Sequence, residues 1–140
     1  MAWLKHLIDF GVLAILLAMS ITAFGIFLER RRVLKSVQVE QFSNRKELEL
    51  ALTRRLHLIA IIASNAPYIG LLGTVLGIIN TFALMGADGQ MEPGRIMSSL
   101  SLALEATAGG LLVAIPAVTL YNLLLRQVKV LLMRWDICHG

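Results

Sequence analysis

Three long stretches of this chain carry almost no charge. Residues 10–28 and 58–87 contain no Asp, Glu, Lys or Arg, and residues 96–125 contain only Glu105. A helix of about 20 apolar residues is long enough to cross the hydrocarbon core of a bilayer. Because hydrocarbon offers backbone groups no hydrogen-bond partners, such segments must be helices that satisfy their own backbone. The chain is therefore expected to be an all-α integral membrane protein with three transmembrane helices.

These stretches leave little chain for anything else. Hydrophobic residues make up 57% of the 140 residues and the mean hydropathy is +0.75, so residues 1–140 are expected to form a single membrane domain. No length remains for a separate catalytic domain, and an enzyme is not expected. Cys138 is the only cysteine, and His6, His57 and His139 share no ligand spacing. They predict neither a disulfide nor a metal site, and no cofactor is expected.

The spans are expected at about residues 8–28, 66–86 and 96–125. The first ends at the basic cluster ERRR, which behaves as a stop and anchor and not as the end of a signal peptide. The second is expected to start near Pro67, because proline disfavours a helical predecessor and lacks a backbone donor. The third would be about 45 Å long if fully helical, so it must tilt or continue into water. Pro116 predicts a kink within it.

Positive charges are distributed unevenly around the spans. Only Lys5 precedes the first span, whereas the loop of residues 29–63 holds most of the basic residues and the loop of residues 87–95 holds one. Basic residues gather on the cytoplasmic side of a membrane protein, so the N-terminus is expected outside and the tail, residues 126–140, inside. This placement explains the excess of 13 Lys and Arg over 9 acids without nucleic acid. Residues 37–55 predict a charged linker helix, and a helix that lies in or projects from the membrane interface is the alternative.

Small residues line one side of the second span. The segment GLLGTVLGIINTF, residues 70–82, has no Lys followed by Ser or Thr, so its glycines do not form a phosphate loop and ATP binding is not expected. At helical spacing, its small and polar residues form one stripe and its bulky side chains fill the other side. Small residues let membrane helices approach closely, so the stripe is expected to pack against protein or face a pore. Its members are Gly70, Gly73, Thr74, Gly77 and Thr81.

The third span carries two stripes of small and polar residues on different sides of the helix. In a monomer of three helices at least one of these stripes would face lipid, so the chain is expected to assemble as an oligomeric ring. One stripe is Ala103, Thr107, Gly110 and Ala114, and the other is Ser98, Ser101, Glu105, Ala108 and Gly109.

Glu105 is the one charged residue of this span. An acid that faces lipid at a helix centre costs about 2.5–3.5 kcal/mol on insertion scales, so Glu105 is expected to face protein or water. Three roles stay open for it. It can carry protons along a pore, pair with a cation of another chain, or act as a neutral acid that hydrogen-bonds helices together.

Two segments resemble a known family. PYIGLLGTVLGIINTF, residues 67–82, and ALEATAGGLLVAIPAVTLYN, residues 103–122, resemble the ExbB/TolQ/MotA proton-channel proteins, and within that family the ExbB branch. A first span that ends in a basic cluster and a total of three spans also agree, whereas MotA-type subunits carry four. The resemblance implies a protein of the bacterial inner membrane in which Thr74 and Thr107 line a proton pathway.

The resemblance also implies partners. A pentamer of this chain, surrounded by membrane lipid, would enclose the transmembrane helices of an ExbD-like dimer, which supplies an aspartate to the proton pathway. The assembly would convert the proton motive force into work on a TonB-like protein and so energise outer-membrane import. A TolQ-like subunit of a Tol-Pal-type motor is one alternative.

The chain departs from the family pattern at one position. Several members carry an acid where this chain has Leu102, whereas here the acid is Glu105, about 60° and 4.5 Å away along the helix. Glu105 and Thr107 are about 200° apart, so both cannot point straight into one pore, and Thr107 is the better candidate for the pore wall.

A small proton-coupled multidrug antiporter is a further alternative, but such proteins place their acid in the first helix, and residues 10–28 hold none. A scaffold that moves no protons also stays open.

Overall fold

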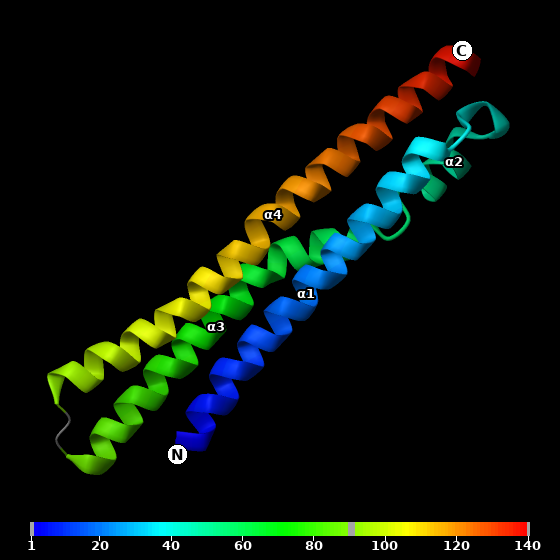
Figure 1. The fold of residues 1–140 in the computed structure, drawn as a ribbon. Coiled ribbons are helices and arrows are strands. Elements are labelled where there is room, and N and C mark those ends of the chain that lie inside the picture. The colour runs from blue at the N-terminus through cyan, green and yellow to red at the C-terminus, as the bar shows by residue number, and fades with distance from the viewer. Residues whose placement is uncertain (1, 90–91, 140) are drawn as a thin grey trace.

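The computed structural model describes residues 2–89 and 92–139, and every regular element in these ranges is a helix. Figure 1 shows an elongated molecule in which α3 and α4 run side by side as a hairpin and α1 leans against them. Three of the helices, α1, α3 and α4, are long and apolar enough to cross a membrane. The predicted all-α fold with three such helices is confirmed. The elements are α1 (Ala2–Ser36), the short 3-10 helix η1 (Val39–Gln41), α2 (Arg45–Leu52), α3 (Leu56–Asp88) and α4 (Pro93–His139).

The long helices extend beyond the apolar stretches that predicted them. α3 starts at Leu56 and continues through Pro67, near which the sequence predicted the start of the membrane span. The polar residues before this proline are absorbed into the helix, because Ser64 and Asn65 donate side-chain hydrogen bonds to the carbonyls four residues earlier, at 2.9 and 2.8 Å. α4 is helical on both sides of Pro116 and runs for 47 residues, or about 70 Å. This length exceeds the thickness of a bilayer, so α4 must tilt or continue into water, as predicted from the sequence.

α3 and α4 touch through their backbones at one pair of glycines. A methyl group at Gly70 would lie 2.6 Å from the carbonyl oxygen of Ala106 and 3.0 Å from the Cα of Gly110. A methyl group at Gly110 would lie 2.6 Å from the carbonyl oxygen of Ala66. No side chain larger than hydrogen fits at either position without separating the helices. We call this contact the glycine seam.

α1 packs into the groove beside the glycine seam. Val12 and Leu16 are buried in a cluster that includes Ala66 of α3 and Ala106 of α4. Further along α1, Ala23 is buried against alanines of both partner helices. The side chains at these crossings are short, so α1 contacts α3 and α4 together.

At the far end of the molecule, the linker between α1 and α3 folds onto α4. Leu48 and Leu52 of α2 are fully buried in a cluster with Leu124 and Val128 of α4. The linker helix predicted over residues 37–55 is shorter, since α2 spans Arg45–Leu52, and its apolar side packs against α4. Trp135 contributes to the same core, where its Nε1 donates a hydrogen bond to the carbonyl of Phe42 at 2.8 Å.

A buried arginine fastens α2 in place. The Nη2 atom of Arg30 donates hydrogen bonds to the carbonyls of Ala51 and Leu52, at 2.7 and 3.0 Å. These carbonyls belong to the last turn of α2, where backbone acceptors lack partners within the helix and the helix dipole favours a cation. Nearby, Arg55 pairs with Glu29 at 2.7 Å and takes a left-handed backbone conformation, φ 67°, that turns the chain into α3.

The glycine seam predicts a large difference between two glycine substitutions. Gly110→Ala places its methyl group against backbone atoms and should lower the free energy of unfolding by about 1–3 kcal/mol. The control is Gly25→Ala, at a helical position of α1 where the added carbon would meet no atom within 4 Å beyond its chain neighbours and the backbone of its own helix. It should leave stability unchanged or raise it by up to about 1 kcal/mol. Thermal unfolding in detergent measures both, and an equal response of the two variants would contradict the seam.

The arginine contact predicts local loosening of α2. Arg30→Met keeps an apolar stem of similar length but leaves the last carbonyls of α2 without donors, which costs about 1–3 kcal/mol. We expect faster amide hydrogen exchange over residues 45–52, with little change in α3. The exposed neighbour Arg32 gives the control Arg32→Met, in which exchange should stay at the wild-type rate.

Candidate functional site

Two threonine hydroxyls meet across the interface of α3 and α4. Thr74 is buried, and its hydroxyl donates to the carbonyl of Ala103 at 2.9 Å. The hydroxyl of Thr107 contacts the same oxygen of Thr74. The structure thus brings together the two threonines that the resemblance assigns to a proton pathway. Thr74 is enclosed by the helix pair, while Thr107 is half-buried and reaches the edge of the interface.

The other small residues singled out in the sequence lie mainly between helices of this one chain. Gly73 and Gly77 continue the glycine seam, since a methyl group at either would lie 2.8 Å from the Cβ of an alanine in α4. Thr81 is buried and donates its hydroxyl to the carbonyl of Gly77, in its own helix, at 2.9 Å. Ala114 is buried in the cluster beside α1, whereas Pro116 is exposed.

The second stripe of α4 lies mostly on the surface of the chain. Gly109 turns toward α1, where an added methyl group would lie 3.5 Å from Leu16. The remaining members of the stripe, Ser98, Ser101, Glu105 and Ala108, are exposed on the surface of the chain. We call these four residues the open polar flank. One stripe of α4 therefore packs within the chain, and most of the other stripe is exposed.

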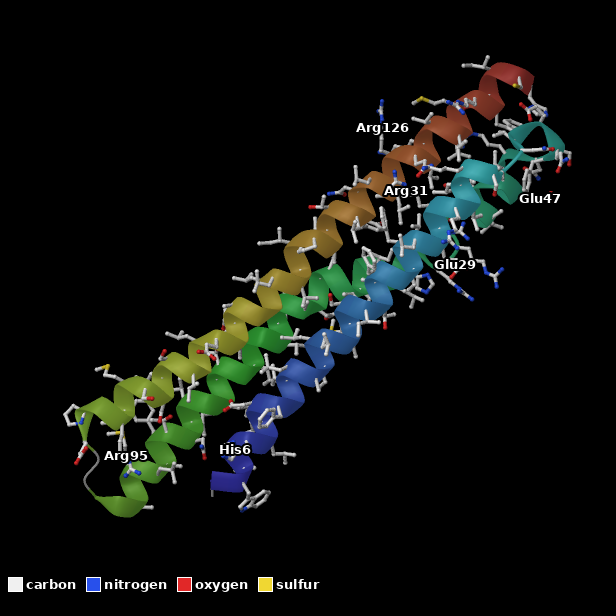
Figure 2. The ribbon with its side chains drawn as sticks, viewed as in Figure 1. His6, Glu29, Arg31, Glu47, Arg95 and Arg126 are labelled. Carbon is white, nitrogen blue, oxygen red and sulfur yellow. The ribbon has the colours of Figure 1, made fainter. Side chains whose placement is uncertain are left out.

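Glu105 does not stand alone on this flank. A recess of about 280 Å³ between α1 and α4 is lined by Glu105, His6 and Asp9, with Phe10, Leu13, Leu102 and Ala106 completing its wall. Figure 2 shows His6 near the N-terminal end of α1. The sequence reading missed His6 and Asp9 because they are almost a hundred positions from Glu105. The signal that remains in the sequence is their spacing of three residues, which puts both on one side of α1.

The chemistry available in this recess is proton transfer. Carboxylates and an imidazole can take up and release protons, and titratable groups within a membrane segment mark proton relays in many transport proteins. Metal binding has less support: over residues 2–89 and 92–139, no three His, Cys, Asp or Glu side chains come together in a group that could hold an ion.

Comparison with known proteins places the chain in a family. A profile of the MotA/TolQ/ExbB proton channel family matches residues 26–137. The chain belongs to this family. It is a multi-pass membrane protein of a proton-channel type, and the family is one of channels and not of enzymes. The resemblance of residues 67–82 and 103–122 is thereby confirmed.

Full-length similarity extends to individual members of the MotA/TolQ/ExbB family. The chain is 50% identical over 137 residues to the biopolymer transport protein ExbB of Aquifex aeolicus, covering 98% of this chain and 93% of that protein. It is 47% identical over 131 residues to the ExbB of Helicobacter pylori strain J99, covering 94% and 90%. The ExbB of Neisseria gonorrhoeae is 46% identical over 78 residues, which is 56% of this chain and 36% of the longer protein. The chain thus aligns with the first two of these relatives over at least nine tenths of their length.

The threonine contact can be tested by removing one hydroxyl. Thr74→Val keeps the shape of the side chain but loses its hydrogen bonds across the interface, which should lower stability by about 1 kcal/mol. Thr74→Ser retains a hydroxyl and should lose less. The matched control is Thr22→Val, because the hydroxyl of Thr22 is exposed and bonds only to Ala18 in its own helix. A thermal-unfolding series in detergent in which Thr22→Val costs as much as Thr74→Val would show that the contact adds nothing.

Proposed function

We propose that this chain is the ring-forming subunit of a proton-driven motor of the ExbB type in the bacterial inner membrane. Five copies surround the membrane helices of an ExbD-like dimer, and proton flow through the assembly does work on a TonB-like protein that energises outer-membrane import. Family membership and the names of the full-length relatives support this assignment.

The open polar flank of α4 is the observation that carries the proposal. Serine hydroxyls and a carboxylate at membrane depth are costly against lipid, since an acid there costs about 2.5–3.5 kcal/mol. The chain covers its other small stripe with its own α3 but leaves Ser98, Ser101 and Glu105 exposed. A ring of copies solves this problem, because the flank then faces a neighbouring chain, an inserted partner helix or a watery lumen.

The distribution of charge supports an N-out, C-in orientation. Figure 2 shows Glu29, Arg31, Glu47 and Arg126 at one end of the molecule, and His6 and Arg95 toward the other. The end with α2 holds most of the arginines and lysines, and basic residues are retained on the cytoplasmic side. The hairpin loop between α3 and α4 then lies in the periplasm.

The recess between α1 and α4 extends the proposed proton pathway. Glu105 with Asp9 and His6 forms a set of proton carriers on the half of the molecule that faces the periplasm in this orientation. Thr107 lies at the edge of the threonine contact and supplies a hydroxyl to the pore wall. One proton that crosses a potential of 100 mV releases about 2.3 kcal/mol, so a few protons suffice to shift weakly packed helices.

Among the alternatives, a TolQ-like role differs only in its partner set, and the ExbB names of the full-length relatives favour the TonB type. A self-sufficient multidrug antiporter has less support, because the chain belongs to a family of channel subunits. A scaffold without proton movement predicts that the polar residues of the flank can be replaced freely.

The proposal is tested by variants of the proton pathway in cells that depend on TonB-type import. Thr107→Ala and Glu105→Ala should leave the ring intact and co-purifying with an ExbD-like single-span partner, but should abolish proton-dependent uptake. The control is Glu47→Ala, which removes an exposed carboxylate from α2 and should leave uptake unchanged. If both pathway variants support normal uptake, the motor assignment fails. If no such partner co-purifies with the wild-type chain, the TonB-type assembly fails.

A further inference from the structure

The three consecutive arginines after the first apolar stretch, residues 30–32, differ in their burial and in their contacts. Arg30 is buried and bonded to the end of α2, as described above. Arg32 is exposed and lines none of the recesses described for the chain. Arg31 instead lies over the ring of Phe27, with its guanidinium carbon 6.0 Å from the ring centroid. Of the three arginines, Arg31 is the one that is both exposed and part of a described recess.

Arg31 opens onto a recess between α1 and α4. The recess has a volume of about 280 Å³ and is lined by Phe27, Arg31 and Lys35 of α1 and by Leu123 and Gln127 of α4. The lining of the recess combines an aromatic and an aliphatic side chain with two cations and an amide, and the charged or polar residues follow the apolar ones along each helix. No acid lines it, and the nearest carboxylate in sequence, Glu29, is held by Arg55. We call this recess the basic pocket.

The basic pocket lies where the apolar part of α1 ends. Residues 10–28 carry no charge, and residues 29–35 carry four cations and one acid. Phe24, one turn below Phe27 on the same side of α1, is largely exposed, as is Leu123 on α4. The apolar wall therefore continues from the pocket toward the hydrocarbon, while the cations stand at the level of lipid headgroups. Negative lipids attract basic residues at this level, and basic pockets between membrane helices bind anionic headgroups.

We propose that the basic pocket is a binding site for one anionic phospholipid. Its phosphate lies between Arg31 and Lys35, with Gln127 donating an amide hydrogen bond, and its acyl chains run along Phe27, Phe24 and Leu123. Charge complementarity selects a lipid of net negative charge, and the apolar wall selects a lipid over a soluble phosphate. The site does not rest on the proposed proton pathway, because it shares no residue with the recess around Glu105. Its occupant contacts both α1 and α4 and so ties the outer helix to the hairpin at this end.

The test measures lipid binding to the full-length chain in detergent by native mass spectrometry. The probes are dioleoylphosphatidylglycerol and dioleoylphosphatidylcholine, which share acyl chains and differ in charge. The double variant Arg31→Gln/Lys35→Gln should bind the anionic lipid about 25-fold more weakly, since each cation near the surface contributes about fivefold. Its matched control, Arg32→Gln/Lys46→Gln, also loses two exposed cations but leaves the pocket lining intact. The control should retain wild-type affinity.

Three results would overturn the proposal. They are equal weakening in the two double variants, equal affinity of the wild-type chain for the zwitterionic lipid, and displacement of the anionic lipid by inorganic phosphate at matched concentration. If the glutamine variant loses its helical circular dichroism, Arg31→Lys/Lys35→Arg decides the question. That variant keeps both charges in the pocket and should keep most of the lipid affinity, whereas loss of binding in a folded sample would contradict the assignment.

Discussion

The close approach of α3 and α4 at Gly70 and Gly110 determines the rest of the structure. Lipid offers no hydrophobic force that pushes two apolar helices together, so membrane helices depend on packing at short range and on hydrogen bonds between them. The absence of side chains at these two positions brings the backbones into contact. It also brings the hydroxyl of Thr74 within reach of a carbonyl on the other helix. The groove in which α1 packs, and hence the meeting of α1 with Glu105, follows from this pair.

The sequence was sufficient for the class of fold because the relevant signal is local. Stretches without charge identify membrane helices one at a time, and the small residues of α3 indicated a face that meets protein. The sequence could not show whether this face packs against a helix of the same chain or lines a lumen, since both arrangements favour the same small residues. The structure assigns the stripe with Gly70 to contact within the chain and leaves the flank with Glu105 open.

Other features escaped the sequence for equally physical reasons. The helix that contains the second span begins at Leu56, eleven residues before Pro67, so the proline does not mark the start of α3. Asp9 and Glu105 line the same recess only because α1 leans against α4, which no short-range pattern contains. The sequence does not distinguish the three arginines of residues 30–32. Their contacts in the fold show that Arg30 is buried and bonded to α2, whereas Arg31 and Arg32 are exposed.

The unbroken course of α4 has a mechanical meaning. This helix runs from the α3–α4 loop through the glycine seam to His139, and it stays helical on both sides of Pro116, which donates no backbone hydrogen bond. The distance from Gly110 to the end of the helix is roughly 44 Å, so a tilt of about 5° around the seam would carry the tip through roughly 4 Å. A helix that moved as one rod would pivot at the glycine seam, where the side chains are smallest. A small movement beside Thr107 would then produce a larger displacement at the C-terminal end of α4.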